Sequence, residues 1–161
     1  GTSNASELAQ LLAALTALRQ GRAGVRLPLD WTGVAGRVAD AFNSVVEQNE
    51  RFAGELARLS RVVGKEGKLS QRLALGDVTG FWRESVGSVN DLIDDLVHPT
   101  IETARVIGAV AQGDLSKTVA LDVDDRPLQG EFLRTAKTIN TMVDQLGSFA
   151  SEVTRVAREV G

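Results

Sequence analysis

The sequence repeats itself, and this repeat restricts the possible folds more than any other feature of the chain. A glycine recurs at equal intervals of 46 residues, at Gly21, Gly67 and Gly113. A later glycine precedes an asparagine by ten residues, which gives the pairs Gly33 and Asn43, Gly80 and Asn90, and Gly130 and Asn140. The interval between the two glycines varies, whereas the interval to the asparagine is constant. Because loops tolerate insertions and helices do not, each repeat is predicted to be a helix, a connector and a second helix.

Apolar residues in the segment after Gly130 follow a heptad pattern. One seam contains Phe132, Ile139, Leu146, Val153 and Val160, and the positions between are filled by Met142, Phe149 and Val156. Such spacing is typical of a left-handed coiled coil or helical bundle, although an amphipathic helix in a monomeric globule is the alternative. Carried back along the chain, the pattern predicts two long helices, about Val34–Lys65 and Phe81–Gln112. Each would span roughly 45–50 Å at about 1.5 Å per residue, so the repeats are expected to share continuous helices.

Two residues interrupt this pattern. Asn49 occupies a core position of its seam, where a buried asparagine would help to fix register and oligomer number. The alternative, a locally loose and hydrated seam, is equally compatible with the sequence. Pro99 lies inside the second long helix, where it removes a backbone hydrogen bond and clashes one turn back. We therefore expect a bend near Pro99 but no complete break.

The connectors are long enough to join parallel helices. A tight antiparallel hairpin needs only about two to eight residues, whereas a connector that returns along a helix of about 15 residues must cover about 22 Å. The glycines that begin the connectors suit helix C-termini, where a left-handed conformation is favourable for glycine. Two apolar anchors are expected to hold each connector on the helices: Leu69 with Leu73, and Leu115 with Val119. The first connector has Ala23 and Leu27 there and should be held less firmly.

Two parallel helices cannot bury their apolar stripes alone, so a second chain is expected to complete a four-helix bundle. The predicted fold is all-α, with concatenated parallel four-helix coiled-coil bundles formed by a homodimer. The predicted units are residues 1–50, 51–97 and 98–150. Residues 151–161 are expected to begin the first helix of a fourth unit, because Glu152–Gly161 resembles Glu55–Gly64.

Composition and motifs point away from catalysis. The net charge of -3 lacks the basic character of a nucleic-acid binder, and the absence of cysteine excludes thiolate chemistry. His98 is followed by proline and lacks the setting of a phospho-acceptor, and the acidic runs at Asp94-Asp95 and 122–125 lack the spacing of a calcium loop. No apolar run approaches the length of a membrane span. We therefore expect no catalytic, cofactor-binding or metal site, no nucleic-acid or membrane contact, and a cytoplasmic location.

The repeats resemble HAMP domains. Gly113-Asp114-Leu115 matches the family's glycine-acidic-leucine signature, and Gly130-Glu131-Phe132 matches the acidic turn that opens its second helix. Asn140 matches the recurring asparagine of the family, and Pro99 matches the proline that often opens its first helix. More specifically, residues from about Glu55 to Gly161 resemble the poly-HAMP arrays of class III hybrid histidine kinases and their bacterial relatives. The first repeat departs from the pattern at Ala23 and Val34, and the second has Phe81 where the acidic residue would be.

This resemblance implies a relay that passes conformational changes through tandem HAMP modules of a sensor histidine kinase, in a two-component system. The implied partners are a second, parallel copy of the chain and the upstream and downstream domains of the same protein. The structural and signalling residues would be the glycines Gly21, Gly67, Gly113 and Gly130, the anchors Leu69, Leu73, Leu115 and Val119, the asparagines Asn43, Asn49, Asn90 and Asn140, and Pro99 and Glu131. The alternatives are a passive coiled-coil spacer or dimerisation module, the HAMP array of a chemoreceptor, and an amphipathic helical protein of lipid surfaces. The mixed, acidic polar faces argue against the last of these.

Overall fold

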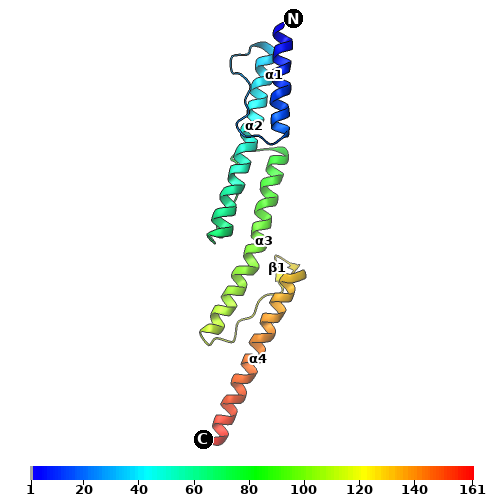
Figure 1. Cartoon of the computed structure of the whole chain (residues 1–161). Coiled ribbons are helices and arrows are strands. Elements are labelled where there is room, and N and C mark those ends of the chain that lie inside the picture. Colours follow the sequence, from blue (N-terminus) through cyan, green and yellow to red (C-terminus); the bar gives the residue numbers. More distant parts are fainter. Residues whose placement is uncertain (1) are drawn as a thin grey trace. The chain divides into compact units, whose positions relative to one another are not determined.

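The structure is a computed structural model that describes residues 2–161, so Gly1 of the first predicted unit lies outside it. The helices are α1 (Thr2–Arg19), α2 (Gly33–Leu59), the π-helix η1 (Ser60–Lys65), α3 (Gly80–Ala111) and α4 (Gly130–Val160) (Figure 1). The two strands are β1 (Asp122–Val123) and β2 (Arg126–Pro127). The chain is mostly helical, which confirms the all-α class. It divides into two compact units, one ending at Val89 and the other comprising Asn90–Gly161.

The two long helices predicted from the heptad pattern are confirmed to within a residue at each end. Helix α2 and η1 together run from Gly33 to Lys65, and α3 runs from Gly80 to Ala111. Pro99 lies inside α3 and does not break it, as expected, while the bend stays a prediction. The π-helical end of the first long helix was not predicted. None of the helices in the described residues has both the length and the apolar character that a membrane span requires.

In the first unit, α1 and α2 lie side by side, and the first connector returns along them (Figure 1). Gly24 contacts Glu50, and the later connector residue Leu27 contacts Asn43, which comes earlier in α2. The connector and α2 therefore run in opposite directions. Helices α1 and α2 are therefore parallel, as the connector length predicted. Their shared core consists of Ala14, Leu27, Ala39, Phe42 and Val46.

The second connector also belongs to this unit and follows η1. Its residues Leu73 and Leu75 are buried, as is Leu59 at the end of α2. Phe52 of α2 and Trp82 of α3 meet edge to face, with their ring centroids 5.6 Å apart. The burial of Leu73 and Leu75 thus anchors this connector.

In the second unit, the end of α3 packs in parallel against the start of α4 around one core. This core consists of Val106, Val119, Ala136, Ile139 and Val143. The third connector contains a hairpin that was not predicted, in which Asp122 pairs with Pro127 and Val123 with Arg126. Asp124 and Asp125 form its turn with φ of 50° and 60°, as a type I′ turn requires. The hairpin accommodates the extra length of this connector, the longest of the three.

Candidate functional site

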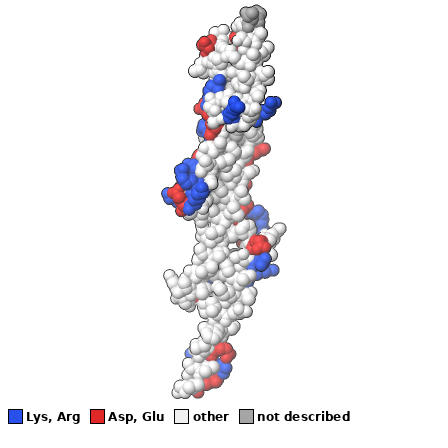
Figure 2. Space-filling view, in the orientation of Figure 1, with Lys and Arg blue, Asp and Glu red and all other residues white. Residues whose placement is uncertain are grey.

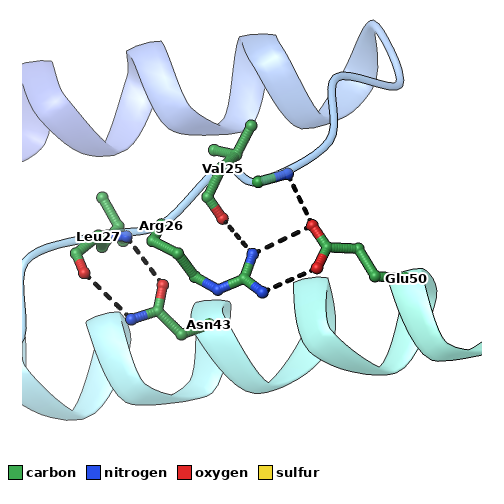
Figure 3. A network of polar contacts seen from close by, with 6 residues as sticks. Val25, Arg26, Leu27, Asn43 and Glu50 are labelled. Atoms are coloured by element: carbon green, nitrogen blue, oxygen red, sulfur yellow. Dashed lines mark hydrogen bonds and ion pairs between the residues drawn. The ribbon is translucent and has the colours of Figure 1, made fainter.

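The first connector is held by the side-chain amide of Asn43 (Figure 3). Asn43 Oδ1 accepts a hydrogen bond of 2.8 Å from the Leu27 backbone N–H, and Asn43 Nδ2 donates one of 3.1 Å to the Leu27 carbonyl. We call this two-bond pairing an asparagine clamp. Leu27 is buried, so its backbone groups have little access to water and need protein partners. The clamp supplies both partners from the neighbouring helix.

A carboxylate of α2 holds the same connector nearer its start. Glu50 accepts a hydrogen bond of 2.7 Å from the Gly24 backbone N–H, and its second oxygen lies 2.8 Å from Nη2 of Arg26 (Figure 3). The hydrogen bond from Arg26, followed by that from Gly24, lowers the pKa of Glu50 to about 2. Glu50 was not predicted as a site residue. The repeat gives no signal for it, because the corresponding positions seven residues after the other asparagines are Val97 and Gly147.

The third connector has the same asparagine clamp. Asn140 Oδ1 accepts a hydrogen bond of 2.7 Å from the Val119 N–H, and Nδ2 donates one of 2.9 Å to the Val119 carbonyl. Val119 is buried in the core beside Val106, and Leu115 packs against that core. Asp114 accepts hydrogen bonds from the hydroxyl and the backbone N–H of Ser116, and these lower the pKa of the Asp114 carboxyl.

The match to a known family falls on the part of the chain that contains this third connector. Residues 77–148 match the model of the HAMP domain family. They form a HAMP domain. HAMP domains are non-catalytic signalling modules, so this segment is a signal-transduction relay module. No solved structure matches the chain.

The second connector, which ends inside the HAMP domain, is held by arginines. Arg58 donates a hydrogen bond of 2.9 Å to the Arg72 carbonyl, directly before the buried Leu73. Arg58 also pairs with Glu55, and this hydrogen bond lowers the pKa of Glu55. Arg51 donates a hydrogen bond of 2.9 Å to the Leu75 carbonyl. Leu75 is a buried residue that the anchor prediction missed, whereas the predicted anchor Leu69 is half-buried.

The glutamate–arginine pair that holds this connector recurs. In α3, Arg105 pairs with Glu102 at 2.9 Å and also donates a hydrogen bond of 3.5 Å to the Thr118 carbonyl, directly before Val119. In α4, Arg155 pairs with Glu152 at 2.7 Å. The recurrence of these pairs was visible in the sequence, but their contact with the connector was not. In α2 and α3 the arginine therefore joins the helix to the connector that follows it.

The repeated glycines lie at the helix ends. Gly21, Gly67 and Gly113 follow helices with φ of 77°, 68° and 83°, and Gly33, Gly80 and Gly130 begin helices with φ of 62°, 59° and 57°. Any other residue would be strained at these six positions. The glycines thus fix where each connector of the HAMP domain and of the preceding segment leaves and rejoins a helix.

The remaining predicted residues all lie in helices. Asn90 is half-buried in α3, and Asn49 is exposed in the single chain. Glu131 lies in the first turn of α4, exposed and 3.4 Å from Arg134, while Val34 and Phe81 are exposed at the corresponding positions. His98 is exposed beside Pro99. The residues from 2 to 161 contain no group of three or more side chains placed to hold a metal ion. Together, these contacts hold the connectors on the helices beside them.

Proposed function

We propose that the chain is a signal relay of three tandem HAMP modules, residues 1–50, 51–97 and 98–150, with residues 151–161 beginning a fourth. The observation that carries the proposal is the asparagine clamp of the first connector. The Asn43–Leu27 clamp lies outside the matched HAMP domain, yet it has the same two bonds as the Asn140–Val119 clamp within it. In both segments the clamped, buried residue follows the connector glycine by six positions.

The relay is proposed to act as a parallel homodimer. In α4, one stripe faces the core of its own unit through Ala136, Ile139 and Val143. Most of the heptad seam is instead exposed, and the large apolar residues left uncovered on α4 are Phe132, Met142, Leu146, Phe149, Val153, Val156 and Val160. Phe149 is 68% exposed and Val153 is 51% exposed, although an apolar stripe of this length favours burial.

Helix α2 has the same two-sided character. Its core-facing residues are Ala39, Phe42 and Val46, while Val38 and Val45, seven residues apart, are exposed. On the face shown in Figure 2, charged side chains gather in a few clusters and leave long uncharged surfaces between them. A second copy in the same orientation would cover these seams and complete a four-helix bundle.

Single cysteines test the parallel dimer, because the sequence has none of its own. In a parallel pair, Val153→Cys lies opposite its counterpart and should form an intermolecular disulfide under mild oxidation. Thr154→Cys, one position away from the seam, is the matched control and should cross-link far less. Equal cross-linking of the two variants, or a monomeric mass in sedimentation equilibrium, would overturn the homodimer.

The parent protein is proposed to be a cytoplasmic sensor histidine kinase of a two-component system, on the resemblance of Glu55–Gly161 to poly-HAMP arrays. An input upstream would alter the packing of one module, and the next would respond because α2 with η1, and α3, each run from one proposed module into the next. Inserting one alanine before Pro99 in the full-length protein should change the activity of the downstream domain. Unchanged output would show that the array is a passive spacer.

A further inference from the structure

The first helix of the second module ends differently from those of the other two modules. Its last six residues, Ser60–Lys65, form the π-helix η1, in which Glu66 N–H donates a hydrogen bond of 2.9 Å to the Arg61 carbonyl five residues earlier. The corresponding helices α1 and α3 end without a π-helical turn. A π-helical turn contains one more residue per hydrogen-bonded ring than an α-helical turn, and such turns are frequent at functional sites.

The hydrogen bonds that close the three helices differ by one residue in the same way. In the first and third modules, the residue after the connector glycine donates to a carbonyl five positions earlier: Arg22 to Ala17 at 3.1 Å, and Asp114 to Ala109 at 2.9 Å. In the second module, Lys68 donates to Val62, six positions earlier, at 3.0 Å. The closing turn of the second module therefore contains one additional residue.

The extra residue can be placed from contacts that the second and third modules share. Arg58 and Arg105 each donate to the carbonyl directly before a buried anchor. From the connector glycine to that anchor the distance is six residues in both modules. From the arginine to the glycine it is nine residues for Arg58 and eight for Arg105. The additional residue thus lies between Arg58 and Gly67, which is where η1 lies.

We infer that η1 is a register switch. Its π-helical turn holds a one-residue insertion, and this residue can belong either to the helix or to the connector. This inference rests on the proposed division into modules. If η1 becomes α-helical, one residue moves into the second connector, and the residues that follow rotate by about 100° and shift by about 1.5 Å relative to α2. The connector, longer by one residue, lets Leu73 separate from the helices while the rest of α2 keeps its hydrogen bonds. The second module would then change its packing more readily than the third.

Two matched deletions test the inference on the chain itself. Gly64 lies within η1 and Gly108 within the last turns of α3, and both are exposed with no neighbouring atom where a side chain would project. Deleting Gly64 should restore the five-residue closing bond and leave Tm within about 2 °C of the original. The third module has no additional residue at this place, so deleting Gly108 shortens the helix that the module needs. It should turn Val110 and Leu115 away from their core and lower Tm by at least about 5 °C.

Hydrogen exchange supplies the second readout. In the unaltered chain, amides of residues 62–66 should exchange at least about tenfold faster than those of residues 107–111, and deletion of Gly64 should remove this difference. Equal losses of Tm for the two deletions would overturn the inference, as would equally slow exchange at both helix ends. These readouts do not involve the downstream output, so a spacer result from the insertion before Pro99 would leave them unaffected.

Discussion

Replacing Asn140 with alanine should release the third connector from α4. The substitution removes both hydrogen bonds to the Val119 backbone, 2.7 and 2.9 Å long, and leaves the N–H and carbonyl of a buried residue without these partners. Each bond contributes about 1 kcal/mol net, and a desolvated group left unpaired adds a further penalty, so the expected loss is about 2–3 kcal/mol. In a chain of this length that corresponds to a decrease in Tm of about 5–10 °C.

Thermal unfolding followed by circular dichroism, with hydrogen exchange at the Val119 amide, measures this effect. Asn140→Asp should retain an acceptor for the Val119 N–H but lose the donor to its carbonyl, so it should fall between the alanine variant and the original. Asn43→Ala is the matched comparison. It should lower Tm less than Asn140→Ala, because Glu50 still holds Gly24 and Arg26 of the first connector. If Asn140→Ala has the same Tm as the original chain and its Val119 amide exchanges equally slowly, the asparagine clamp does not hold the connector.

Three further substitutions test other contacts by thermal unfolding. For Glu50→Gln, the pKa of the carboxyl is lowered in the folded chain from 4.5 to about 2, so its stabilising effect is present above pH 4.5 and is lost as the pH falls towards 2. The Tm difference from the original should shrink over that interval, and a constant difference would contradict this. Val106→Ala empties a fully buried site and should cost about 2 kcal/mol, so an unchanged Tm would refute its core role. Pro99→Ala supplies an N–H for the Asp95 carbonyl and should raise Tm by a few degrees, whereas a lower Tm would mean that α3 depends on the proline.

The helices and the parallel pairing could be predicted because their signals are local and repeated. The heptad pattern extends over dozens of residues. It therefore predicted the ends of α2 with η1, and of α3, to within one residue. The long connectors excluded a tight hairpin and left the parallel arrangement that the structure has. The constant spacing from glycine to asparagine marked Asn43 and Asn140 as recurring, although it did not show that their amides pair with a backbone.

The features that could not be predicted occur in a single sequence repeat or depend on contacts between residues distant in sequence. Glu50 and Arg26 are 24 residues apart, and the other repeats have Val97 and Gly147 at the position of Glu50, which cannot form this ion pair. The β1–β2 hairpin depends on the left-handed conformation of two consecutive aspartates. In the sequence, these aspartates look like part of a solvated acidic run. The extra residue in η1 shows in the closing hydrogen bonds of the three helices, which no local sequence pattern encodes.

The first and third connectors share the asparagine clamp but differ in the contacts beside it. The first adds an exposed ion pair of Arg26 with Glu50 to its asparagine clamp, and such pairs are weakened by salt. The contacts of the second include two arginine–carbonyl bonds and the burial of Leu73 and Leu75. The third combines its clamp with the buried Val119. Connectors with identical contacts would separate from their helices at the same cost in free energy. Because these contacts differ, we expect each connector to separate at its own cost, and the proposed relay would respond in the order that these costs set.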